Sequence, residues 1–375
     1  MNKMAATMAL VCASNLGYAH DLKALPLGDG KLSQVPKVGW IWACHVDPQA
    51  GGSQRDGPWI NAAQGTYDAT AKAVVPGQVA WPSQFSLTVR QDQRVFSSND
   101  LPSHTTGTFP VPSDSEAYRY DRNPNRIGAQ TLQVALPLWP TLAAQASCAP
   151  GALGFLLTGA VLFNALDAPG RDAVAHETQD ACQGHPQESG VYHYHSLSNC
   201  LPDKREPGGH SVLVGYLLDG FGLYGPFGEG GQALASQDLD ECHGHIHTIA
   251  WEGKQVAMYH YHATPDFPYT AGCLRGKYSN ADVMALSGPH PQRGQGGRPG
   301  AEGRNPPGSG MAMPGGGAPR PMDGPPDLSR AAVTLGISVQ KLRDALGPPP
   351  PDLGGAAGRL GISVDVLRSA LDAAR

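Results

Sequence analysis

Positive charge is scarce in this chain, and no basic stripe occurs along it. Its 375 residues include 27 Lys and Arg against 32 Asp and Glu, which gives a formal net charge of -5. Domains that bind nucleic acids gather Lys and Arg on one face or along one helix. We therefore expect no nucleic-acid partner.

Long apolar runs are also missing beyond the N-terminus. The longest, "GALGFLLTGAVLFNALDA" at 151–168, is interrupted by glycines and by polar or charged residues. It falls short of the roughly 20 apolar residues that a membrane-spanning helix needs. The run instead predicts buried strands, and we expect no transmembrane segment once the N-terminal signal is removed.

The N-terminus has the pattern of a secretory signal. An early Lys precedes an apolar stretch from Met4 to about Leu16, and small residues lie at the -3 and -1 positions of a cut after Ala19. We expect residues 1–19 to be a signal peptide and the mature protein to be periplasmic or extracellular. The alternative is that the apolar start is simply a disordered or helical N-terminus.

Cysteine usage agrees with export. Cys12 would leave with the signal, so six cysteines remain, an even number that favours disulfides over thiolate metal ligands in an exported chain. These are Cys44, Cys148, Cys182, Cys200, Cys242 and Cys273.

Composition divides the rest of the chain into three parts. Short apolar or alternating runs separated by Pro, Gly, Asn and Asp predict a mainly β domain over residues 20–286. Residues 287–325 are dominated by Gly and Pro, which predicts a disordered linker. Residues 326–375 hold a tandem repeat.

The two repeats read "PDLSRAAVTLGISVQKLRDAL" at 326–346 and "PDLGGAAGRLGISVDVLRSAL" at 351–371. Leu and Ala recur at helical spacing, Gly336 and Gly361 would end a first helix, and Ser338 and Ser363 would cap a second. We expect two small helix-turn-helix units. Few cations lie there, so we favour a packing or attachment module with a cell-envelope partner over a DNA-binding one.

An internal duplication lies within the β domain. "LLTGAVLF" (156–163) matches "LLDGFGLY" (217–224), and each is followed by Asp-x-Cys-x-Gly-His, then Tyr-His-Tyr-His, then Cys-Leu. The units span about 151–201 and 212–275. If each unit holds its own disulfide, Cys182 pairs with Cys200 and Cys242 with Cys273, which leaves Cys44 for Cys148. This is one of fifteen connectivities that six cysteines allow.

The repeated tetrapeptide predicts a metal site. Alternate residues of a strand face the same way about 6.6 Å apart, so each His-x-His presents two imidazoles on one face and its tyrosines on the other. We expect the two copies to line one groove that holds zinc or copper. The alternative is ordinary hydrogen-bonded strand histidines. The candidate ligands are His193, His195, His260, His262, His185, His245, His243 and His247.

An enzyme is the second hypothesis. Glu241, Asp240 and Glu177 are candidate catalytic carboxylates that would activate a metal-bound water, although turn formation explains them equally well. No nucleophile elbow, phosphate loop or His-Glu-x-x-His motif occurs, so a hydrolase or oxidoreductase reaction cannot be named. A third hypothesis is a carbohydrate- or cell-surface-binding module, with four tryptophans as stacking platforms: Trp40, Trp42, Trp59 and Trp81.

These motifs resemble the YHYH domain proteins, which are largely exported bacterial proteins of uncharacterised activity. The stretches that carry the resemblance are 172–201, 213–231, 238–276 and, more weakly, 39–60. The resemblance covers about residues 36–280 and implies the identity of the domain. It implies almost nothing about chemistry, so the metal prediction depends on the histidines alone.

Overall fold

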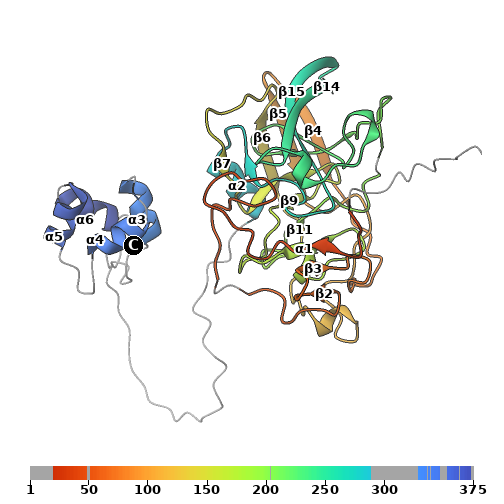
Figure 1. Cartoon of the computed structure of the whole chain (residues 1–375), viewed down its shortest axis with the longest axis horizontal. Coiled ribbons are helices and arrows are strands. Elements are labelled where there is room, and N and C mark those ends of the chain that lie inside the picture. The colour runs from red at the N-terminus through yellow and green to blue at the C-terminus, as the bar shows by residue number, and fades with distance from the viewer. Residues whose placement is uncertain are drawn as a thin grey trace, which may run out of the picture. The chain divides into compact units, whose positions relative to one another are not determined.

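The structure, a computed structural model, describes residues 20–48, 51–202, 204–288 and 328–372, apart from residues 336, 338, 347–352 and 363. The chain divides into two compact units, residues 1–296 and 297–375 (Figure 1). The expected signal peptide and residues 289–325 of the expected linker lie outside the described residues.

The first unit is mainly β, which confirms the predicted class. Its helices are short: α1 (Ala173–His176), α2 (Asn280–Ser287) and three single 3-10 turns, Ala117–Arg119, Glu229–Gly231 and Ser236–Asp238. In Figure 1, β2 and β3 lie at the opposite end of this unit from β14 and β15. The strands are β1 (Leu25–Pro26), β2 (Ile60–Asn61), β3 (Thr66–Tyr67), β4 (Phe85–Arg90), β5 (Gln93–Ser98), β6 (Leu132–Pro137), β7 (Ser147–Cys148), β8 (Ala152–Leu156), β9 (Val161–Phe163), β10 (Gly184–Pro186), β11 (Tyr192–Tyr194), β12 (Leu213–Leu217), β13 (Gly222–Tyr224), β14 (Gly244–Trp251), β15 (Lys254–His262) and β16 (Cys273–Leu274).

The duplication is built into an eight-stranded sheet of order β10-β11-β9-β8-β12-β13-β15-β14. Each half contains a hairpin (β8–β9 or β12–β13), whose second strand runs parallel to the strand that carries Tyr-His-Tyr-His. The outer strand of each half, β10 or β14, pairs antiparallel with that strand. The halves therefore repeat one topology about the β8–β12 seam.

Glycines let the two halves approach at this seam. β8 and β12 pair antiparallel, with Gly154 opposite Leu217 and Gly215 opposite Leu156. A Cβ atom on Gly154 would lie 2.1 Å from the carbonyl oxygen of Tyr216, far inside contact distance. A side chain at this position would force the seam apart.

A three-stranded sheet, β4-β5-β6, packs on the large sheet through aromatic side chains. Phe96 of β5 stacks on Phe155 of β8 with 3.7 Å between ring centroids, and neither is exposed to solvent. Apolar burial of this kind is the main stabilising term of a domain core. The run at 151–168 is therefore buried strand, as predicted, in β8 and β9.

Three disulfides join the cysteines in the pairs that the duplication predicts. They are Cys44–Cys148, Cys182–Cys200 and Cys242–Cys273. The second closes a loop around the β10–β11 hairpin, and the third ties the segment before β14 to β16. Each half of the sheet thus has its own covalent link.

In the part of the second unit that the structure describes, four helices pack around a core of their own. They are α3 (Leu328–Leu335), α4 (Val339–Leu346), α5 (Leu353–Leu360) and α6 (Val364–Asp372). α5 ends at Gly361, which has φ of +70° while the next amide, of Ile362, donates to the carbonyl of Ala357. The predicted end of this helix is confirmed, whereas Gly336, Ser338 and Ser363 lie outside the described residues. Among the described helices of both units, none has the length and apolar character to cross a bilayer.

Candidate metal centres

The sheet separates the repeated histidines into two groups. Site A comprises His185, His193 and His195 with Glu177, and site B comprises His210, His245, His260 and His262. Five inter-strand steps separate β11 from β15, which is about 24 Å along the sheet. The expectation of one shared groove is therefore wrong, because the halves meet at β8 and β12 and their histidine strands lie away from the seam.

Strand alternation separates tyrosines from histidines in both halves. The Tyr192 hydroxyl donates to Asp180 at 2.9 Å, and the Tyr259 hydroxyl donates to Asp240 at the same distance. Both carboxylates also accept backbone amides of the Asp-x-Cys-x-Gly turn. The tyrosines thus anchor the turn that leads into β10 or β14, on the face opposite the histidines.

Backbone carbonyls fix the histidine tautomers in site A. His195 donates from Nδ1 to the carbonyl of Asn164 at 2.5 Å, and His193 donates from Nδ1 to that of Val191 at 3.3 Å. In a neutral imidazole the other nitrogen then carries a lone pair. The two Nε2 atoms face each other at 3.2 Å, an arrangement that suits a shared cation.

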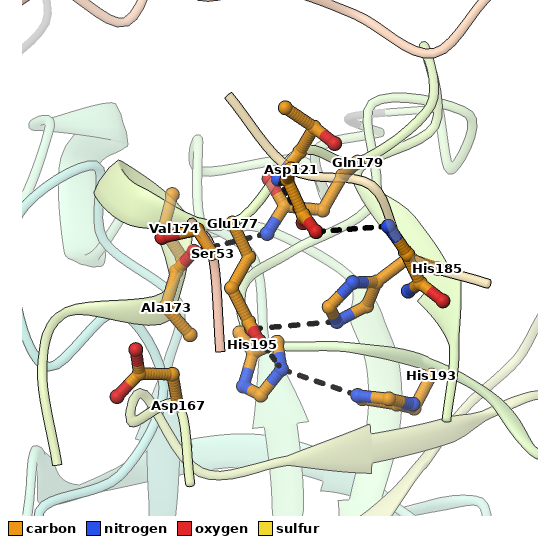
Figure 2. A network of polar contacts seen from close by, with 12 residues as sticks. Ser53, Asp121, Asp167, Ala173, Val174, Glu177, Gln179, His185, His193 and His195 are labelled. Carbon is orange, nitrogen blue, oxygen red and sulfur yellow. Dashed lines mark hydrogen bonds and ion pairs between the residues drawn. The ribbon is translucent and has the colours of Figure 1, made fainter. Parts of the chain in front are cut away.

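Glu177 supplies the carboxylate of site A. It directly follows α1, whose first turn is capped by the Asp172 side chain, and its Oε2 lies 3.5 Å from Nε2 of His195 and 3.6 Å from Nε2 of His185. Figure 2 shows this carboxylate directed at the two rings, with His193 beyond His195. His185 is 3% exposed, and neither of its ring nitrogens has a hydrogen-bond partner in the described part of the chain.

Site B repeats this geometry with a fourth imidazole. The Nε2 atom of His260 lies 3.1 Å from that of His245 and 3.3 Å from that of His210. The Nδ1 atoms of His210, His260 and His262 each donate a hydrogen bond to a backbone carbonyl, at 2.7, 3.1 and 2.6 Å respectively. Nε2 of His262 is buried without a hydrogen-bond partner among the described residues. The strand registers pair His185 with His193 in site A and His245 with His260 in site B.

Burial keeps these imidazoles neutral. It lowers the pKa of His195 to about 4 and that of His260 to about 3. The pKa values of His185, His193 and His262 are likewise lowered by burial, well below the ordinary range. A neutral imidazole is the form that binds a metal ion, so no proton has to leave at neutral pH.

The carboxyl of site A responds to burial in the opposite direction. Burial raises the pKa of Glu177 well above its usual value, and the neighbouring Asp121 and Asp167 raise it further while Lys72 opposes them. A cation among the three imidazoles would reverse this, because it favours the charged carboxylate.

The nearest contacts in both sites are close to the spacing of tetrahedral ligands, and the ligand atoms of each histidine group all lie within 4.8 Å of one another. Two ligand atoms that each lie 2.1 Å from a zinc ion at tetrahedral angles are about 3.4 Å apart. The contacts above range from 3.2 to 3.6 Å in site A and from 3.1 to 3.3 Å in site B. Each histidine group could therefore hold a metal ion.

Four candidate residues lie outside the two groups. His243, at φ of +79°, directs Nε2 to the Thr264 hydroxyl at 3.0 Å, and His247 contacts Glu229 beside site B. Asp240 accepts amides of its own turn, as the alternative interpretation held. The Glu241 carboxylate lies 3.8 Å from Arg275 and is 42% exposed.

His210 is the ligand candidate that sequence reasoning missed. It lies in "REPGGHSVL" without a repeated spacing or a second histidine nearby. The loop before β12 places His210 at the site. This loop packs closely against Gly231, because Gly209 has no side chain: a Cβ atom on Gly209 would lie 2.5 Å from the Gly231 amide nitrogen. The only sequence signal for His210 was weak: it directly follows two glycines and precedes the second duplicated unit.

Clefts border both sites. A cleft of about 690 Å³ reaches all three histidines and Glu177 of site A. A smaller cleft of about 300 Å³ is lined by His210 of site B together with His247, Glu206 and Glu229.

Other candidate features have structural roles. His104 lies near Cys182 and Cys200, but those sulfurs form a disulfide and are not thiolates. Trp59 is 4% exposed and donates to the carbonyl of Ala175, so it cannot serve as a stacking platform. Trp40 is half-buried, with the Lys37 ammonium 3.3 Å from its ring centroid.

Comparison with known proteins bears on the first unit. No significant match is found among curated proteins or among solved structures. A family model described as "YHYH protein" matches residues 133–233, which contain β8 to β13 and all of site A. Residues 133–233 of the chain are therefore similar to the YHYH protein family, as the resemblance of the motifs implied.

Proposed function

We propose that this domain binds two transition-metal ions, zinc or copper, one in site A and one in site B. The observation that carries the proposal is the approach of Nε2 of His193 to Nε2 of His195 at 3.2 Å while both Nδ1 atoms face backbone carbonyls. Two buried lone pairs at this distance repel each other unless a cation lies between them.

Ligand chemistry supports the same metals at both sites. Imidazole and carboxylate ligands suit zinc and copper(II), and the six cysteines of the described residues all form disulfides. Three disulfides also support an exported location, since such bonds persist in oxidising compartments.

Metal content of the purified full chain tests the proposal. We expect two zinc or copper ions per chain in the wild type, one in the double variants His193→Ala/His195→Ala and His260→Ala/His262→Ala, and none when all four are replaced. His243→Ala is the matched control, because this buried histidine belongs to the same segment as His245 but lies outside both sites. It should retain both ions.

The outcomes separate clearly. A wild type that holds no metal, and whose melting temperature does not rise when zinc or copper is added, rejects both sites. One ion per chain, lost equally from either double variant, would restore the shared groove that the sheet order argues against.

A further inference from the structure

The two sites differ in the group that completes them. Site A has three imidazoles and one carboxylate, whereas site B has four imidazoles. All four groups of site A line the larger cleft, but only His210 of site B lines the smaller one. Metal sites with four protein ligands and no access serve structure, and those with an open position serve chemistry.

We propose, on the basis of the two-metal function above, that a metal ion in site A exchanges one coordination position with a ligand from the cleft, while site B is saturated and structural. The ligand class is an uncharged or cationic molecule with an oxygen donor. An exchangeable position is also what a metal-dependent hydrolase or oxidoreductase requires, so site A is where an enzyme activity of this domain would reside.

Glu177 is the group that gives way to the incoming ligand. The Nδ1 atoms of His193 and His195 donate hydrogen bonds to backbone carbonyls, which fix the positions of both rings. The Glu177 carboxylate instead makes its polar contacts to two site A histidines, and no backbone amide of the described residues anchors it. It also extends from the residue after a four-residue helix, on a flexible side chain.

The lining of the cleft indicates the charge of the ligand. Beyond the site itself it carries Asp47, Asp121, Asp167 and Glu188, and none of the lining residues is Lys or Arg. Arg171 pairs with Asp167 at 2.7 Å, and Arg171 and the buried Lys72 also act on Glu177, so these two cations offset part of the negative charge. Glu188 is an exposed lining residue, and its charge disfavours the entry of anions.

Hydroxamic acids of different charge test both parts of the proposal on the cobalt(II)-loaded full chain. Acetohydroxamic acid is neutral, glycine hydroxamic acid is cationic and succinic monohydroxamic acid is anionic, yet all present the same chelating group. The visible absorption of cobalt reports the coordination change. We expect saturable spectral changes, with the anionic compound binding at least about fivefold more weakly than the cationic one.

Variants assign the change to one site. His210→Ala, which damages site B, should keep the hydroxamate response, and His193→Ala, which damages site A, should lose it. Should circular dichroism show that His193→Ala is unfolded, Glu177→Gln takes its place, with cobalt retained and hydroxamate bound at least about threefold more tightly.

The opposite results are equally distinct. Two bound cobalt ions with no spectral response, or a response that survives only in His193→Ala, would overturn the exchangeable position and leave the two-metal proposal intact. The absence of any bound cobalt would reject both. An anionic hydroxamate that binds as tightly as the cationic one would overturn the ligand class.

Discussion

Individual histidines in this domain are oriented by the backbone and kept neutral by burial. The carbonyls of Asn164 and Gly225 accept Nδ1 of His195 and His262, at equivalent points after β9 and β13. A hydrogen bond from Nδ1 to a backbone carbonyl sets the tautomer of the imidazole and orients its Nε2 atom. The arrangement predicts how the stability of the metal-free protein depends on pH.

Acid should weaken the contribution of the buried histidines to stability, whereas buried carboxyls with raised pKa values, such as Glu177 and Asp100, act in the opposite direction. The folded-state pKa of His195 is lowered to about 4 against about 6.5 unfolded, so between these values the unfolded chain binds more protons. This contribution is complete above pH 6.5 and falls as pH drops toward 4, by up to about 1.4 kcal/mol per pH unit for each such histidine. Urea unfolding of the wild type and of His195→Gln at pH 7 and pH 5 isolates this contribution, and an equal change in stability with pH in both proteins would contradict it.

Removal of one tyrosine hydroxyl should weaken one half of the sheet. Tyr192→Phe removes the hydrogen bond to Asp180, and Tyr259→Phe removes the matching bond to Asp240. Hydrogen bonds to charged groups contribute about 1.5–3 kcal/mol, so we expect a loss of that size in the free energy of unfolding. Tyr118→Phe, a half-buried site outside the sheet, is the control. Losses below about 0.5 kcal/mol in both variants would show that the tyrosines act only through packing.

At the scale of elements, the two hairpins that carry the sites are covalently restrained. Cys182–Cys200 spans 18 residues around β10 and β11, and Cys242–Cys273 spans 31 residues around β14 and β15. A disulfide that closes a loop of this length stabilises the folded state by about 3 kcal/mol. Each link should therefore serve the site within its own loop.

Loss of one disulfide should affect one metal site. In Cys182→Ser/Cys200→Ser we expect weaker zinc binding at site A with site B unchanged, and in Cys242→Ser/Cys273→Ser the reverse. Isothermal titration of each variant with zinc would separate the two affinities. Equal weakening of both sites in either variant would mean that the halves fold as one unit without local support.

The order of elements also explains what the sequence could and could not reveal. Tyr-His-Tyr-His and Asp-x-Cys-x-Gly-His predicted the strands, the faces and the disulfides, because period-two alternation and rare residues are local signals. The β8–β12 seam is a long-range pairing, so the separation of the two sites was not readable. A glycine-containing loop places His210 in site B, and the left-handed backbone of His243 directs its side chain away from that site. No local sequence pattern predicts either position.

For the whole molecule, the groups of described residues that could hold a metal ion lie in the first unit. All residues of sites A and B lie before residue 263, and the helical unit has its own core around Leu342 and Leu367. Units with separate cores fold independently as a rule. A chain that ends at residue 296 should keep two metal ions and a calorimetric melting temperature within about 2 °C of the β domain in the full chain. Loss of either ion would show that the helical unit supports a site.

The most direct test of the two-site account is anomalous diffraction from crystals of the zinc-loaded chain. The account predicts two peaks per chain about 24 Å apart, one among His185, His193 and His195 and one among His210, His245, His260 and His262. A single peak, or peaks that avoid both groups, would contradict it.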